Sequence, residues 1–282
     1  MKQQAPEWLS LICQGGSFEE VEKWLEAAAE YGFKTVQPVF FWANYTESDF
    51  DRLAKKLNQL QLSTVAFGVY SDLYKWDKPA GACFESTIED LKLAASCAHK
   101  LDTMNLVSWC GTVGDFAAPT EANASEEVIA TFKANQEKLL PTLIEHDVTF
   151  LFEPWRDHIL ADEKMTMDAC QVSPDHYKAV IDFPNFISPE QWPQREERIA
   201  AITAALHSHA GIIHLKDMLI NAEGTVELPM FGRGDLTSEL AKAMEPYVGK
   251  YAIIAEHMQQ PEDLPELIES VWRDGPRVPQ RV

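Results

Sequence analysis

Four apolar runs in the second half of the chain carry, at or near their ends, a side chain that can bind a metal ion. They are Glu153 in FLFEPW, Asp182 in AVIDFPNF, His214 in GIIHLKDM and Glu256 in AIIAEHM. Short apolar runs predict buried strands, and a carboxylate buried without a partner costs several kcal/mol. A divalent cation would balance these charges, and three carboxylates with one imidazole suit Mn²⁺, Mg²⁺, Zn²⁺ or Co²⁺.

Each of these residues also has an ordinary structural explanation. A Glu or Asp that follows a strand often caps a helix or faces water, and a His within an apolar run is often a hydrogen-bonded core residue. The same position recurs in four successive runs, however, and this recurrence favours one shared metal site over four separate structural roles.

Strand-like runs alternate with amphipathic stretches along the whole sequence. The first amphipathic stretch, residues 17–33, opens with Ser17 and Glu20 in a capping-box pattern and ends near Gly32. The helical signal is weak at residues 158–177, and Pro141 is expected to kink the helix that contains it. The apolar runs cover residues 9–14, 34–42, 62–70, 102–109, 148–155, 178–186, 211–218 and 251–258.

Eight strands and eight mostly helical connections predict a parallel α/β architecture, and the length of 282 residues fits a closed (β/α)8 TIM barrel. We expect a single domain over residues 1–282, with an irregular tail at about 274–282. An open doubly wound sheet is the alternative, but CQGGSF after the first strand lacks the GxGxxG turn. In a barrel the strand ends face one side, so the four candidate ligands would converge there.

Composition narrows the class of partner. Acidic residues outnumber basic ones 44 to 24, and the net charge of -20 argues against nucleic acid and anionic membranes. The five cysteines are scattered without a CxxC pair, which indicates free thiols in a reducing compartment. The opening MKQQAPEWLS has no signal-peptide pattern, and no apolar run is long enough to span a membrane. A soluble, cytoplasmic protein is expected.

The stretches FEPW, IDFPNFISPEQW, IIHLKDM, GRGDL and AIIAEHM, in this order, resemble the xylose isomerase-like TIM barrels, also called the sugar phosphate isomerase/epimerase superfamily. The resemblance covers nearly the whole chain. It implies that Glu153, Asp182, His214 and Glu256 bind one divalent metal ion, with Mn²⁺ as the first candidate.

The same resemblance implies a metal-dependent isomerase or epimerase of a small, ketose-type carbohydrate. Proton transfer would pass through a metal-bound enediolate, with Glu153 and Glu256 serving as both ligands and acid/base residues. Family members also suggest a homodimer.

Seven further residues are candidates for substrate binding. Asn185 stands where ketose 3-epimerases of the family have a His, and an amide binds hydroxyls but does not titrate near neutral pH, which argues against that particular activity. Lys216 and Arg233 could bind substrate oxygens, although an ion pair and a solvated loop residue are the alternatives. Four aromatic residues could form an apolar wall against a sugar face, or pack under loops instead: Phe40, Trp42, Trp109 and Trp155.

Other classes of function remain open at this point. A polyol or inosose dehydratase would use the same metal site, and a non-catalytic sugar-binding relative would be expected to have lost ligands. The superfamily also contains DNA repair endonucleases, but these need a basic groove and more metal ligands. Redox chemistry is disfavoured because no dinucleotide fingerprint is present.

Overall fold

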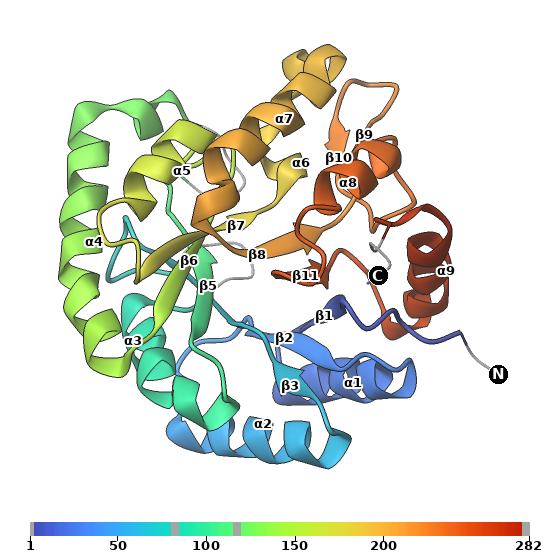
Figure 1. Cartoon of the computed structure of the whole chain (residues 1–282). Coiled ribbons are helices and arrows are strands. Elements are labelled where there is room, and N and C mark those ends of the chain that lie inside the picture. Colours follow the sequence, from blue (N-terminus) through green and yellow to red (C-terminus); the bar gives the residue numbers. More distant parts are fainter. Residues whose placement is uncertain (1–2, 80–84, 115–119, 278–282) are drawn as a thin grey trace.

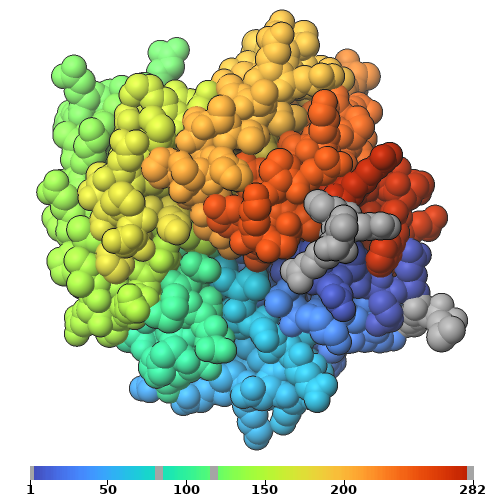
Figure 2. All heavy atoms as spheres, viewed as in Figure 1, coloured from blue at the N-terminus to red at the C-terminus, as the bar shows by residue number. Residues whose placement is uncertain are grey.

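The computed structural model describes residues 3–79, 85–114 and 120–277, and its centre is a closed barrel of eight parallel strands (Figure 1). The prediction of a TIM barrel is confirmed. The ring closes because β1 pairs with both β2 and β11, and Figure 2 shows the first and last parts of the chain side by side. The barrel strands are β1 (Leu9–Gly15), β2 (Thr35–Phe40), β4 (Phe67–Asp72), β5 (Asn105–Trp109), β6 (Thr149–Glu153), β7 (Tyr177–Ile181), β8 (Ala210–Leu215) and β11 (Ala252–Ala255).

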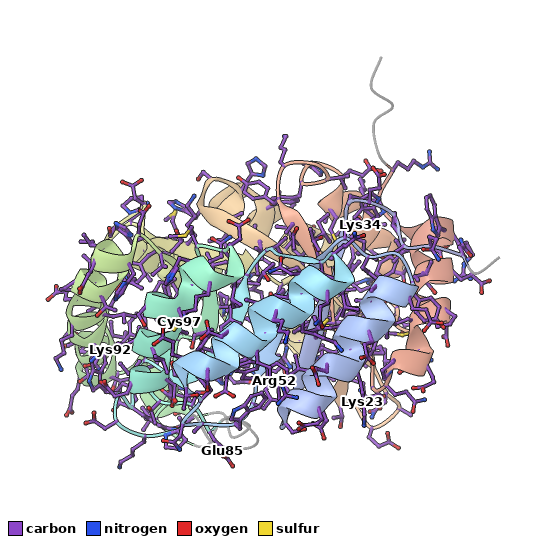
Figure 3. The ribbon with its side chains drawn as sticks, turned by 90° about the horizontal axis from the view of Figure 1, so that it is seen from below. Lys23, Lys34, Arg52, Glu85, Lys92 and Cys97 are labelled. Atoms are coloured by element: carbon purple, nitrogen blue, oxygen red, sulfur yellow. The ribbon has the colours of Figure 1, made fainter. Side chains whose placement is uncertain are left out.

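The helices surround the barrel, as Figures 1 and 3 show. Ser17 accepts a hydrogen bond from the Glu20 amide, and Glu20 accepts one from Gly16, so the predicted start of the first helix is correct. Pro141 lies inside α4, which runs from Glu126 to His146. The helices are α1 (Phe18–Glu30), α2 (Glu47–Leu60), α3 (Ile88–Cys97), α4 (Glu126–His146), α5 (Glu163–Cys170), α7 (Arg195–Leu206), α8 (Thr237–Met244) and α9 (Leu264–Asp274).

Short elements complete the connections. In the region of weak helical signal, α5 is only 8 residues long. The two-residue strand β3 (Ser63–Thr64) pairs in parallel with the start of β2, and β9 (Leu219–Ile220) pairs with β10 (Val226–Glu227) as a small antiparallel hairpin. The one-turn and 3-10 segments are α6 (Phe183–Phe186), η1 (Ala98–Leu101), η2 (Glu121–Ala124), η3 (Pro189–Gln194), η4 (His207–His209) and η5 (Pro261–Asp263).

The loops that precede the barrel strands and the loops that follow them lie at opposite ends of the barrel. Lys34 precedes β2 and Glu85 follows β4, and Figure 3 shows these residues at opposite ends. We call the end at which the strands finish the mouth.

Cys13, Cys97, Cys110 and Cys170 are buried and form no disulfide, whereas Cys83 lies outside the described residues, as do residues 278–282 of the expected tail. No helix of the described part of the chain is long and apolar enough to cross a membrane.

Candidate metal centre

The four residues singled out in the sequence meet at the mouth of the barrel. One ligand atom from each of Glu153, Asp182, His214 and Glu256 lies within 4.8 Å of the others, and all four residues are buried. Glu153 ends β6, Asp182 directly follows β7, His214 lies in β8 and Glu256 directly follows β11. The order of the strands around the ring therefore brings together side chains that are about a hundred residues apart in the sequence.

Each carboxylate of this cluster has one oxygen held by a donor of the protein. The Tyr70 hydroxyl donates to Glu153 Oε2 at 2.8 Å. The Lys216 ammonium donates to Asp182 Oδ2, and to Glu256 Oε1 at 2.7 Å. Asp182 Oδ1 is buried without a hydrogen-bond partner. One oxygen of each carboxylate is thus fixed, and the other remains available to a ligand.

The imidazole of His214 is oriented in a similar way. Its Nε2 lies 3.1 Å from Gln37 Oε1, and because an amide oxygen only accepts, this nitrogen carries the proton. Its Nδ1 then faces the acids, 3.6 Å from Glu153 Oε1 and 3.5 Å from Glu256 Oε2, and forms no hydrogen bond. When the ring is neutral, the Nδ1 lone pair is directed at the centre of the cluster.

The pKa values of the cluster reflect a shortage of positive charge. Burial, together with the neighbouring carboxylates, raises the pKa of Asp182 to about 7 despite Lys216. Burial alone would lower the pKa of His214, but Glu256 and Glu153 outweigh it and raise that pKa to about 9. Burial also acts to raise the pKa of Glu256, yet Lys216 and His214 hold it well below its usual range. Without a cation, protons and Lys216 balance the charge.

The residues present fit a divalent metal ion. Asp182 Oδ1 and His214 Nδ1 are buried polar atoms without a partner, and such atoms require an explanation. A cation bound by one atom of each residue would satisfy both of them. The donor set of three carboxylate oxygens and one imidazole nitrogen is one that divalent cations accept.

Three of the other residues selected from the sequence lie beside the centre. Asn185 is buried, and its Nδ2 donates to the carbonyl oxygen of Pro154 at 3.1 Å, which ties the loop after β7 to the end of β6. Trp109 is buried at the end of β5, and its ring packs against Tyr70 with the centroids 4.9 Å apart. Lys216, only 2 % exposed, binds two of the candidate ligands directly.

The structure does not bring Arg233 or Phe40 to the cluster. Arg233 binds Glu266 at 2.6 Å and Asp263 at 3.3 Å at the surface. Phe40 lies in the core, and Trp42 stacks on it at 4.1 Å. Phe40 is three residues beyond Gln37, and side chains alternate along a strand, so the two face opposite sides of the sheet.

Trp155 is half-buried and donates from Nε1 to Asp157 Oδ2 at 3.2 Å, with Arg156 over its ring.

The loop that contains GRGDL is organised by Asp217. This buried carboxylate accepts from the amides of Met218, Gly232 and Leu236 at 2.9 to 3.1 Å. This part of the motif therefore has a structural role.

Sequence reasoning did not identify Tyr70 or Gln37. Tyr70 lies within an apolar run, where an aromatic residue is ordinary. Gln37 interrupts another apolar run, TVQPVF, and its side chain is 0 % exposed. An amide in the middle of a buried strand is the signal that could have indicated a partner inside the barrel.

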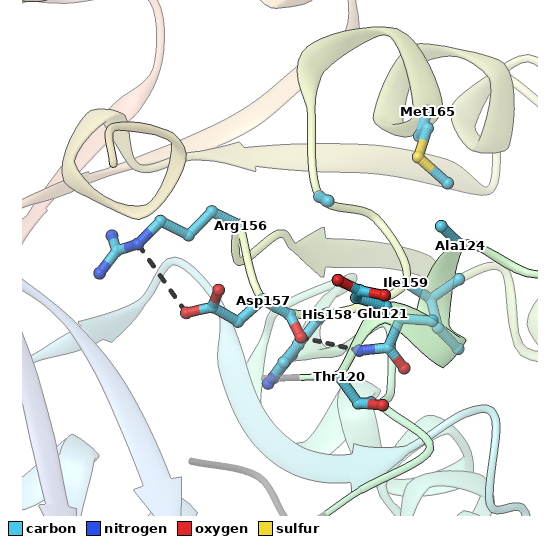
Figure 4. Close-up of a pocket in the computed structure, with 10 residues that line it drawn as sticks. Thr120, Glu121, Ala124, Arg156, Asp157, His158, Ile159 and Met165 are labelled. Atoms are coloured by element: carbon cyan, nitrogen blue, oxygen red, sulfur yellow. Dashed lines mark hydrogen bonds and ion pairs between the residues drawn. The ribbon is translucent and has the colours of Figure 1, made fainter. Parts of the chain in front are cut away.

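Two hollows lie near the mouth. One, of about 390 Å³, is bounded by the loops after β1, β2 and β11, and we call it the rim hollow; its wall includes Gln14, Gly16, Phe41, Gln259 and Gln260. The other, of about 320 Å³, is lined by the loops after β5 and β6 (Figure 4).

The comparisons agree with this architecture. The profile of the xylose isomerase-like TIM barrel family matches residues 25–271, so the chain belongs to this family. No curated protein sequence matches the chain.

Solved structures with the same fold share little sequence with the chain. The probable 3-DHS dehydratase AsbF from Bacillus anthracis has a TM-score of 0.65 at 15% identity, over 97% of this chain and 99% of its own. A D-psicose 3-epimerase, solved with D-fructose, has a TM-score of 0.61 at 14% identity, over 97% and 91%. The 3-keto-D-glucoside 4-epimerase YcjR from E. coli has 0.65 at 11%, over 95% and 98%. At such identities the likeness shows the fold.

Proposed function

We propose that the protein is a divalent-metal-dependent isomerase or epimerase that moves a proton on a small, ketose-type carbohydrate. The observation that carries this proposal is the convergence of four buried ligand atoms within 4.8 Å, from the ends of four successive barrel strands. The similar structures of D-psicose 3-epimerase and 3-keto-D-glucoside 4-epimerase support a reaction of this type.

A divalent cation held by these residues would supply Lewis acidity, which makes the hydrogen next to a substrate carbonyl more acidic. Glu153 then accepts that proton, and Glu256 returns one to the substrate. Return to the same carbon from the other side inverts it, whereas return to the adjacent carbon isomerises the sugar. Both carboxylates lie beside His214 Nδ1, which is consistent with a shared substrate position between them.

Tyr70 and Lys216 have complementary roles in this proposal. The Tyr70 hydroxyl holds Glu153 through one oxygen, so the carboxylate cannot rotate away from the substrate. The Lys216 ammonium holds Glu256 and Asp182, and it is close enough to the cluster to bind a substrate oxygen. Asn185 could offer its remaining amide oxygen, which has no partner, to a substrate hydroxyl.

Proton exchange with solvent tests this function. The Mn²⁺-loaded protein would be incubated in D₂O with a panel of ketoses, hydroxypyruvate and inososes, and the C–H signals followed by NMR. We expect deuterium uptake at the carbon next to the carbonyl, and its loss in Glu153→Gln and Glu256→Gln. A Glu256→Gln protein that turns over normally would exclude the two-carboxylate scheme.

The same experiment separates an epimerase from a dehydratase. A dehydratase begins with the same proton removal but then loses a β-hydroxyl, so its product contains a new double bond. One structure with the same fold is that of a probable 3-DHS dehydratase, which supports the dehydratase as the second candidate.

A further inference from the structure

Most of the Lys and Arg side chains in the loops at the mouth already bind other groups of the protein. Lys75 donates to the carbonyl oxygen of Gly114 at 2.9 Å and pairs with Asp72. Arg156, one of the residues that line the adjoining hollow (Figure 4), donates to the carbonyl oxygens of Pro184 and Ile187 at 3.2 and 3.1 Å.

The remaining cations offer an anion little. Lys216 and Arg233 are bound by carboxylates, whereas Lys23 and Lys78 are exposed, where water and salt screen their charge. Lys23 lies on the wall of the rim hollow, but Glu20 on the same wall carries the opposite charge. Residues 80–84 and 115–119, which lie outside the described part, contain neither Lys nor Arg.

Acidic side chains also lie beside several backbone donors in the described loops at the mouth. In this fold helices begin near the strand ends, and the amides of a helix start readily bind phosphate. Here acidic side chains of the chain itself lie at five helix starts, where each accepts from a backbone amide at 2.7 to 2.9 Å; this amide belongs to the N-cap residue, to the residue before it or, for Met165, to the first turn. The pairs are Glu20 with Gly16, Asp49 with Thr46, Asp90 with Thr87, Asp162 with Met165 and Asp263 with Gln259. A phosphate would therefore meet a negative charge beside each of these helix starts.

The charge balance of the metal centre also argues against an anionic substrate. Three buried carboxylates face one buried ammonium, Lys216, so one divalent cation makes the centre neutral. An anionic substrate would then add a negative charge that nothing nearby compensates, at a high cost in a buried site. A neutral substrate leaves the balance intact, and proton transfer to a carboxylate conserves the total charge.

The rim hollow offers a surface suited to hydroxyl groups. The side-chain amides of Gln14, Gln259 and Gln260 on its wall both donate and accept hydrogen bonds, as sugar hydroxyls do. Phe41 and Trp24 add aromatic surface, against which the apolar face of a sugar can pack.

We infer that the substrate of this centre is an uncharged polyhydroxylated carbonyl compound, without phosphate or carboxylate, whose hydroxyl groups remote from the reacting carbon occupy the rim hollow. The inference rests on the proposed function of the metal centre and narrows it to one class of substrate.

Matched pairs of ligands that differ by one phosphate test the inference. D-fructose and D-fructose 6-phosphate, and D-ribulose and D-ribulose 5-phosphate, would be titrated into the Mn²⁺-loaded protein by calorimetry, with deuterium uptake measured in parallel. We expect each neutral ketose to bind and exchange at least about tenfold better than its phosphate ester. Equal or tighter binding of the esters would overturn the inference, as would binding of neither class.

The calorimetric and exchange measurements distinguish two kinds of failure. Neutral ketoses that bind selectively but never exchange would preserve the inferred ligand class and refute the proposed reaction. Phosphate esters that exchange faster would preserve the reaction and refute the inferred class.

Glu20→Gln tests the contribution of the capping acids. It removes a negative charge beside Gly16 on the wall of the rim hollow, so discrimination against the phosphate ester should fall several-fold. Glu26→Gln, on the same helix and outside the wall of this hollow, removes the same charge and should leave discrimination unchanged. Equal discrimination in the two variants would contradict the role of the capping acids.

Discussion

At the scale of single residues, the centre is defined as much by what holds its ligands as by the ligands themselves. Gln37 fixes the proton of His214 on Nε2, and Tyr70 fixes one oxygen of Glu153. Partners of this kind set ligand orientation and basicity, and their loss typically weakens metal affinity by about 10- to 100-fold.

Gln37→Leu should therefore weaken Mn²⁺ binding by about 10- to 100-fold while the barrel still folds. The leucine removes the acceptor for Nε2–H, so the imidazole loses its fixed orientation. Calorimetric titration with Mn²⁺, with circular dichroism to check the fold, measures this. Gln37→Glu keeps an acceptor for Nε2–H and should bind Mn²⁺ more tightly than Gln37→Leu. An unchanged dissociation constant in Gln37→Leu would refute the role of Gln37.

The thiols give a second prediction at this scale. Burial raises the pKa of Cys110 and of Cys170 to about 12, and raises that of Cys13 as well, so these thiols stay protonated and inaccessible. Cys97 is also buried. At pH 8 we expect a thiol reagent to label at most one cysteine of the native protein quickly, and all five after unfolding. Rapid labelling of several native thiols would contradict the described packing.

The four ligands could be identified from sequence because each stands at the end of an apolar run, where the fold exposes strand ends to one space. Tyr70 could not, because an aromatic residue in an apolar run is ordinary. Gln37 left a signal, an amide within a buried strand, but the sequence does not show that its partner is His214, 177 residues away. Arg233 is the opposite case, a residue that the sequence suggested for the site and that the structure places elsewhere. Its Gly-rich loop resembles one that covers a site, but carboxylates of η5 and α9 bind the side chain at the surface.

At the scale of elements, the alternation of strand-like and helical stretches and the length of the chain predicted the barrel. The exact connections between the strands depended on tertiary contacts. Helix α5 is the clearest case, because its 8 residues give little periodicity. Its first residue, Glu163, forms a paired interaction with Arg198 of α7 at 2.7 and 2.9 Å. The contact fixes a helix that its own sequence barely specifies.

Glu163→Gln should lower the free energy of unfolding by about 1 kcal/mol near neutral pH. Hydrogen bonding to Arg198 lowers the pKa of Glu163 below its ordinary value of 4.5, so the ionised carboxylate is the stabilising form. The contribution is fully present above pH 4.5 and is lost as the pH falls through the lowered pKa. Urea unfolding of both proteins at several pH values should show the difference shrinking in acid.

The control for this pair is Lys164→Gln. Lys164 pairs with Asp168 on the exposed side of α5, and its side chain is 76% exposed. Its loss should change stability little. A difference for Glu163→Gln that persists undiminished to pH 2 would mean that the charge of Glu163 is not the source of the effect.

At the scale of the whole molecule, the buried acids couple metal binding to stability. The folded barrel holds the ligand atoms together, and the unfolded chain does not, so a cation should stabilise only the folded form. At a Mn²⁺ concentration of about 100 times its dissociation constant, the gain is about 2.7 kcal/mol. For a chain of this size that raises Tm by about 5 to 10 °C.

Thermal unfolding with Mn²⁺ and with a chelator checks this prediction. The shift should largely vanish in Asp182→Asn, which removes a ligand charge without a change of size. An equal shift in that variant would place the stabilising ion elsewhere on this acidic protein.

The placement of the ligands and their holders along the chain has a consequence for how the protein is made. All four ligands come from residues 153–256, whereas Gln37 and Tyr70 come from strands that leave the ribosome first. The last ligand directly follows β11, the strand whose pairing with β1 closes the ring. A nascent chain therefore cannot assemble all four ligands until its final strand is in place, so binding of a cation by the complete set would report that folding has finished.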